Sequence, residues 1–227
     1  MNIQSIYNKY AKKIHPMYCD VILGPEAISS LLSNTFIPHL FAESVDKNKS
    51  FLKGKIGKKI TNLTIIDDGT LEYGVASTNF DGDGNSTKRN IVIDNGILIK
   101  YLYDDFYAKK YGVESTGNSE RDYKSLPSIG TTNFIIGGET LEGIEEGFII
   151  NELRGAHTAN SISGDFSVEI SSGFYINDGE RKHPIKHGMI VGNIFEFLNK
   201  VKGVYGQVKD TGGIITPSII SEARVVG

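Results

Sequence analysis

The 227-residue sequence is 39% hydrophobic and 22% charged, with a formal net charge of -3 at neutral pH. This length suits one large domain or two small ones, and the composition favours a folded core over wholesale disorder. Basic residues are scattered apart from one short cluster at Lys53, Lys55, Lys58 and Lys59; we therefore expect a solvated face there and no nucleic-acid partner.

The first half of the chain alternates helical and extended patterns. Apolar residues recur at helical spacing over residues 3–14, and a short buried strand is expected at residues 21–23. A helix follows from Pro25, because proline suits a first helical turn, and Pro38 must kink or end it. A second strand is predicted at residues 63–66.

The clearest hairpin signal lies at residues 91–101. Two β-branched or apolar runs flank Asn95-Gly96, a pair that accepts the positive φ angles of a type I′ turn. A helix is predicted over residues 104–111 and should stop at Gly112.

The second half is richer in strands. Alternation at period two over residues 166–176 indicates a half-buried strand that turns at 177–179. The remaining expectations are strands at 133–136, 148–153, 181–186 and 214–226, a short helix at 140–146, and an amphipathic helix at 192–202. Together these patterns predict an α+β fold, a β-rich antiparallel domain of hairpins with a few packed helices.

Features missing from the sequence indicate the cellular compartment of the protein. A single cysteine, Cys19, excludes an internal disulfide and fits a reducing cytoplasm. No run reaches the ~20 apolar residues of a membrane helix, and the first residues show no signal-peptide pattern. We expect a cytoplasmic protein with no membrane partner.

Several motifs, in this order and at these separations, resemble the carboxy-terminal domain of the TldD/PmbA family, on the PmbA (TldE) side. They are AESV at 42–45 with KSFLKGKIG at 49–57, YLYD at 101–104 with ESTGN at 114–118, LRGAHTAN at 153–160 with GDFS at 164–167, and the closing GN at 192–193 and TPS at 216–218. The resemblance covers roughly residues 18–227, after a helical lead-in at 1–17. Family members carry a further amino-terminal domain of comparable size, which is expected to be absent here.

The resemblance implies a function. Family members pair as TldD with PmbA in a cytoplasmic metalloprotease that processes or degrades small unfolded peptides, and the family was also named as a modulator of DNA gyrase. TldD holds the metal through a helical H-E-x-x-x-H motif and a further cysteine near the carboxy terminus, whereas PmbA is its metal-free relative.

The expected metal ligands are missing from this sequence. Aligning the Leu-Leu pair that precedes the motif puts Ser33 and Pro38 at the two histidine positions and Asn34 at the glutamate position. No cysteine lies in the final strands. Because a zinc site needs three protein ligands, we predict no metal in this chain, with zinc only in a TldD-like partner.

Two other groups of acidic or imidazole side chains are possible metal sites. His39 and Glu43 are four residues apart, with Asp46 nearby, and could share a helical face; a solvated surface is the favoured interpretation. The run from Asp81 to Asn85 resembles the start of a calcium loop, but the twelfth position is Val92, so a polar hairpin loop is favoured.

One loop is the candidate peptide-binding or partner-facing surface. Its candidate residues are His157, Thr158, Asn160, Ser163 and Asp165. Two neutral interpretations compete: a hydrogen-bonded core histidine, and a simple turn at Gly164-Asp165. A hydrolytic triad of Ser163, His157 and Asp165 is discounted, because residues this close on one loop rarely reach relay geometry.

The function predicted from the sequence is a metal-free, PmbA-like subunit or domain of a TldD/PmbA-type peptidase complex, not catalytic by itself. Its partners would be a TldD-like catalytic subunit, or a second copy, and an extended peptide bound along a sheet edge. The alternative is a non-proteolytic interaction or scaffold protein derived from the same domain.

Overall fold

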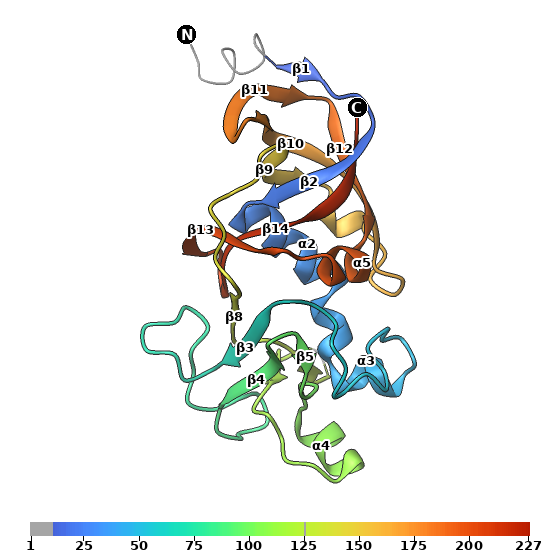
Figure 1. Ribbon diagram of the computed structural model, residues 1–227. Helices are drawn as coiled ribbons and strands as arrows, with labels where there is room; N and C mark the ends of the chain where they lie inside the picture. The colour runs from blue at the N-terminus through green and yellow to red at the C-terminus, as the bar shows by residue number, and fades with distance from the viewer. Residues whose placement is uncertain (1–10, 125) are drawn as a thin grey trace.

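The computed structural model describes residues 11–124 and 126–227 (Figure 1). Four α-helices and two 3-10 helices occur in this part of the chain: α2 (Pro25–Thr35), η1 (Ile37–Leu40), α3 (Ala42–Asp46), α4 (Asp105–Tyr111), η2 (Ala156–Thr158) and α5 (Ile194–Asn199). No helix among these residues is long and apolar enough to cross a membrane.

Most strands of the described residues belong to one twelve-stranded sheet. They are β1 (Lys12–Lys13), β2 (Met17–Leu23), β3 (Thr64–Asp68), β4 (Arg89–Asp94), β5 (Ile97–Leu98), β8 (Asn133–Gly137), β9 (Gly147–Arg154), β10 (Asp165–Asn177), β11 (Glu180–Lys186), β12 (Gly188–Asn193), β13 (Gly203–Asp210) and β14 (Ile214–Val226). A separate antiparallel pair is formed by β6 (Ser119–Glu120) and β7 (Ser128–Ile129).

The sheet is mostly antiparallel. Its main order is β1-β11-β10-β9-β2-β14-β8-β3-β4-β5, and β12 and β13 pair off this path with β10 and β14. Only the β1–β11, β2–β9 and β8–β14 pairings are parallel within the described chain. The predicted class is therefore confirmed: hairpins dominate, and the helices are few and short.

Helix α2 lies against the sheet and buries one face. Ala27, Ile28, Leu31 and Leu32 are all fully buried, at the helical spacing expected from the sequence. Pro25 occupies the first turn, and the helix ends at Thr35, ahead of Pro38 in η1. Proline ends the helix because it has no N–H to donate and its ring clashes with the preceding turn.

The predicted hairpin at Asn95-Gly96 joins β4 to β5. Asn95 and Gly96 have φ angles of 46° and 87°, as a type I′ turn requires. Gly96 also packs closely, since a Cβ there would lie 2.1 Å from the carbonyl oxygen of Thr61. Helix α4 matches its prediction too: Asp104 caps its start through the N–H of Tyr107, and Gly112 ends it in a left-handed conformation.

Other expectations need correction. The helix predicted over residues 3–14 falls mainly outside the described residues, and Lys12–Lys13 form strand β1 instead of its last turn. The helix predicted at 140–146 is wrong: the segment is irregular, and its start pairs with β13, where Leu141 donates its N–H to the carbonyl of Val204. Pairing with an available strand edge has overridden the helix-forming side chains. The helix predicted at 192–202 is shorter, because Gly192-Asn193 end strand β12.

Candidate functional site: a cationic and aromatic groove beside helix α5

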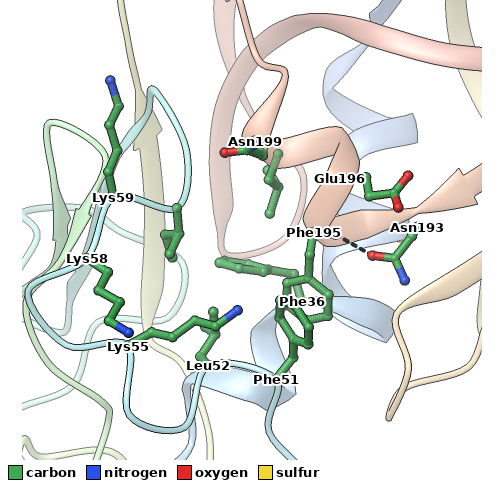
Figure 2. Close-up of a pocket in the computed structure, with 12 residues that line it drawn as sticks. Phe36, Phe51, Leu52, Lys55, Lys58, Lys59, Asn193, Phe195, Glu196 and Asn199 are labelled. Carbon is green, nitrogen blue, oxygen red and sulfur yellow. Dashed lines mark hydrogen bonds between the residues drawn. The ribbon is translucent and has the colours of Figure 1, made fainter.

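A concave feature that joins aromatic and charged side chains lies between α5 and the loop that connects α3 to β3 (Figure 2). Its volume is about 500 Å³. Phenylalanines form its floor and lysines form one wall; the central residues are Phe36, Phe51, Lys55, Lys58, Lys59 and Phe195. We call this feature the lysine groove.

The floor of the lysine groove is a stack of rings. Phe51 and Phe195 lie with their centroids 4.3 Å apart and their planes 28° apart, while Phe36 meets Phe195 edge-on at 6.3 Å. Phe51 keeps 52% of its surface exposed, although it is a large apolar side chain. The stack therefore presents an aromatic face to whatever enters the groove.

The wall is cationic. The Lys55 Nζ atom lies 3.3 Å from the centroid of the Phe51 ring, a cation–π contact. Burial first, and then the neighbouring charge of Lys58, lower the pKa of Lys55. Within the described chain, no carboxylate lies within ion-pair distance of Lys55, Lys58 or Lys59. Lys53, Lys58 and Lys59 are exposed, as a solvated face requires, and the same cluster also forms one wall of the groove.

The buried His39 positions the loop that bears Phe51. Its imidazole Nδ1 accepts the backbone N–H of Phe51 at 3.0 Å, and its backbone carbonyl accepts the hydroxyl of Ser50 at 2.7 Å. The ring packs edge-on against Phe195, with centroids 4.8 Å apart. Burial lowers the pKa of His39 to about 4, against the opposing effect of the Ser161 backbone. The imidazole is therefore neutral at physiological pH, with its proton on Nε2.

The remaining anchors of the loop are also hydrogen bonds. The hydroxyl of Tyr101 donates to the carbonyl of Leu52 at 2.6 Å, and the amide of Asn62 donates to the carbonyl of Val201 at 2.6 Å. Since Val201 follows α5, the second bond ties the end of the loop to the other side of the groove.

Asn193 connects the lysine groove to the loop predicted as the candidate surface. Its Oδ1 accepts the N–H of Phe195 and so caps α5, as Figure 2 shows. Its Nδ2 donates to the carbonyl of Ser163 and to the Asp165 carboxylate, both at 2.8 Å. The predicted loop therefore abuts the start of α5.

The five predicted loop residues form a compact turn. Asn160 Oδ1 accepts the N–H groups of Ile162 and Ser163, and the Thr158 hydroxyl donates to the carbonyl of Gly155. His157 is exposed on η2, so it is not the core histidine that was one neutral interpretation. The turn at Gly164 is real, with a φ of 79°. Whether the loop contacts a peptide or a partner remains a prediction.

Ser163 and Asp165 do not form a hydrolytic relay. The Ser163 hydroxyl donates directly to the Asp165 carboxylate at 2.7 Å, with no imidazole between them. Hydrogen bonds from Asn193 and then Ser163 lower the pKa of Asp165. A triad needs the histidine between the nucleophile and the acid, so this pair stabilises the turn.

The positions predicted to correspond to the family's metal ligands lie on α2 and η1. Ser33 and Asn34 each return a hydrogen bond to the helix backbone, to the carbonyls of Ser29 and Ser30 at 2.9 and 2.8 Å. Pro38 offers no ligand atom in its side chain. Ser33 also lines a second hollow with Thr131, Gly212 and Gly213.

These residues do not fit zinc. Catalytic zinc takes imidazole, thiolate or carboxylate ligands, and hydroxyl, amide and pyrrolidine groups stand in their place. Across the described residues, no three His, Cys, Asp or Glu side chains gather closely enough to hold a metal ion.

The side chains of the His39 and Glu43 metal hypothesis make other contacts instead. His39 and Glu43 do not share one helix, because Phe41 between them is extended. Glu43 pairs with Lys47, and Asp46 pairs with Lys110 at 2.7 Å and accepts the Tyr111 hydroxyl.

Asp81 forms the polar hairpin loop that the sequence favoured. Its Oδ1 accepts the N–H groups of Asp83 and Asn85, and a β-bridge between Phe80 and Ser86 closes the loop.

Sequence reasoning missed the lysine groove as a site. The signal was present in the stretch SFLKGKIGKK at 50–59, where exposed apolar and basic residues are interleaved. Its significance depends on Phe195, which lies far away in the sequence.

Comparisons with known proteins agree with this fold. Residues 16–227 match the family described as the PmbA/TldA metallopeptidase C-terminal domain. An uncharacterised protein of Methanocaldococcus jannaschii is 42% identical over 211 residues, which are 91% of this chain and 50% of that protein. The metalloprotease PmbA of Escherichia coli O157:H7 is 28% identical over 225 residues, 95% of this chain and 47% of that protein.

A solved structure shows the same architecture. The crystal structure of TldE from Thermococcus kodakarensis superposes with a TM-score of 0.87 at 30% sequence identity, covering 98% of this chain and 54% of that one. The chain thus spans about half the length of the relatives it matches. This chain belongs to the PmbA/TldA metallopeptidase C-terminal domain family. The relatives that it matches include proteins named PmbA, TldD and TldE.

Proposed function

We propose that this chain is the metal-free, PmbA- or TldE-like member of a cytoplasmic metallopeptidase complex that acts on small unfolded peptides. The observation that supports this most strongly is the identity of the side chains at the metal positions. Ser33 and Asn34 hydrogen-bond to helix carbonyls, and Pro38 has no donor or acceptor side chain. A catalytic zinc and its activated water would then belong to a TldD-like partner.

The role of this chain in such a complex would be to complete the chamber that holds the peptide. An extended peptide can pair with a sheet edge through main-chain hydrogen bonds whatever its sequence. The loop of His157, Thr158, Asn160, Ser163 and Asp165 would face the partner or the peptide, beside the cap of α5 formed by Asn193.

The test is to purify the chain alone and after co-expression with a TldD-like protein, and to measure zinc and peptide hydrolysis in each sample. We expect zinc and activity only in the complex, at one zinc per TldD-like chain. Replacing Glu43 by Ala should leave both unchanged, because that carboxylate pairs with Lys47.

Two results would contradict the proposal. Zinc at one per chain in the isolated protein, or hydrolysis by that protein alone, would show that it has its own catalytic site. Failure to associate with any TldD-like protein would instead favour a non-proteolytic interaction protein built from the same domain.

A further inference from the structure

The lysine groove carries positive charge that no neighbouring carboxylate neutralises within the described residues. Lys55 and Lys58 face the groove from one loop, while Lys59 lines its edge and points away from the rings (Figure 2). No carboxylate in the described chain pairs with these three lysines. Figure 2 shows Glu196 beyond Phe195, on the side away from the lysines. The like charges of Lys55 and Lys58 are also close enough to oppose each other. An anion in the groove would relieve this repulsion.

The same space has an apolar surface directly beside the cations. The exposed ring of Phe51 stacks on Phe195, and the ammonium of Lys55 lies 3.3 Å from the centroid of that ring. The volume of about 500 Å³ falls within the ~300–1,000 Å³ typical of small-ligand sites. A ligand that fits must therefore present an anion and an apolar group from nearly the same point.

We infer that the lysine groove binds the carboxyl-terminal residue of a short peptide, with the free carboxylate on the lysines and an apolar side chain against Phe51. A terminal residue suits this arrangement because its carboxylate and its side chain leave the same Cα atom. This inference rests on the proposed function in taking a peptide as the ligand, and it adds which end of the peptide is recognised and by which residues.

The site is held in place before any ligand arrives. His39, Tyr101 and Asn62 fix the loop by hydrogen bonds, and Asn193 fixes the start of α5. A preformed site loses less conformational entropy on binding, so short peptides with few contacts can still be held.

The test compares two peptides that differ in one group: N-acetyl-Gly-Gly-Phe as the free acid and as the carboxyl-terminal amide. Binding of each to the full chain is measured by isothermal titration calorimetry at low salt. We expect the amide to bind about tenfold more weakly, since it removes one or two ion pairs of modest strength. Added salt should weaken binding of the acid and leave that of the amide nearly unchanged.

Variants then locate the binding. The double substitution Lys55→Ala/Lys58→Ala should abolish the difference between acid and amide, while Lys55→Arg/Lys58→Arg should keep it. The matched control is Lys12→Ala/Lys13→Ala on β1, which removes the same charge at exposed positions outside the groove and should bind like the parent. Phe51→Ala should weaken both peptides and keep their ratio.

Each outcome decides the inference separately from the proposed function. Equal binding of acid and amide, no binding of either, or the same loss in the Lys12/Lys13 control would overturn it. Any of these would leave zinc content and partner association untouched. Conversely, selective acid binding with no TldD-like partner would support the groove and contradict the peptidase role.

Discussion

The imidazole Nδ1 of His39 accepts the backbone N–H of Phe51 at 3.0 Å, twelve residues along the chain. This bond positions the exposed Phe51 ring, which forms part of the floor of the lysine groove. His39 itself has only 1% of its surface exposed, so removing the imidazole takes away both this hydrogen bond and buried packing.

Replacing His39 by Ala should therefore lower the free energy of unfolding by about 3 kcal/mol, from the lost hydrogen bond and the cavity left by the imidazole. Urea denaturation followed by circular dichroism measures this change. The exposed His157→Ala is the control and should stay within about 0.5 kcal/mol. A similar small change for both variants would show that the His39 bond contributes little.

The pH dependence of stability should show two opposing titrations. The folded-state pKa of His39 is lowered from 6.5 to about 4, so its contribution is fully present above pH 6.5 and is lost as pH falls towards 4. Burial raises the pKa of Asp67 from 3.8 to about 6, so that group instead makes the fold more stable as pH falls through the same range. Each effect is roughly 3 kcal/mol.

The wild-type stability should thus change little from these two groups between pH 6.5 and 4, and His39→Gln should expose the Asp67 titration. We expect this variant to gain stability as the medium is acidified, measured as the urea midpoint at each pH. Parallel pH profiles for variant and wild type would contradict the assignment to His39.

Asn193→Ala should disconnect α5 from the loop at 160–165. The change removes the helix cap and the two hydrogen bonds to Ser163 and Asp165, at a cost of about 2 kcal/mol. Hydrogen exchange should rise at the N–H of Phe195 and in the loop. Asn199→Ala, a change at an exposed position at the end of the same helix, serves as the comparison and should leave both regions protected.

Gly96→Ala should be far more harmful than Gly84→Ala. Both glycines have a positive φ, 87° and 84°, so both substitutions carry the same backbone cost of about 1 kcal/mol. Only at Gly96 would the new Cβ collide with a backbone oxygen, that of Thr61 at 2.1 Å, whereas Gly84 has open space. Thermal unfolding should show that Gly96→Ala lowers the free energy of unfolding by about 2 kcal/mol more than Gly84→Ala does. Equal losses would show that the positive φ angle accounts for the whole effect and the collision for none of it.

Local signals predicted the elements that depend on local physics. The Asn95-Gly96 turn, the helix stop at Gly112 and the alternation along β10 all appear where the sequence placed them. The helix expected at 140–146 failed because a distant strand, β13, offered backbone partners. No periodicity within that segment reports the presence of β13.

The candidate site was harder to predict for the same reason. The absence of metal-ligand side chains at Ser33, Asn34 and Pro38 could be read directly from residue identities. The lysine groove requires Phe51 and Phe195 to meet across the fold. The spacing of His39 and Glu43 suggested one helical face, but the extended conformation of Phe41 breaks it.

Strand β14 gives the fold a particular order of assembly. It pairs with β2, β8, β12 and β13, and its partner β2 leaves the ribosome long before it does. During synthesis β2 must wait with one edge uncovered, a state that invites pairing with other chains. Contacts of such long sequence separation also form slowly. Aggregation is therefore most favoured while the chain is still on the ribosome, close to other nascent chains. Chaperones that bind unfolded chains should act on this protein before β14 emerges.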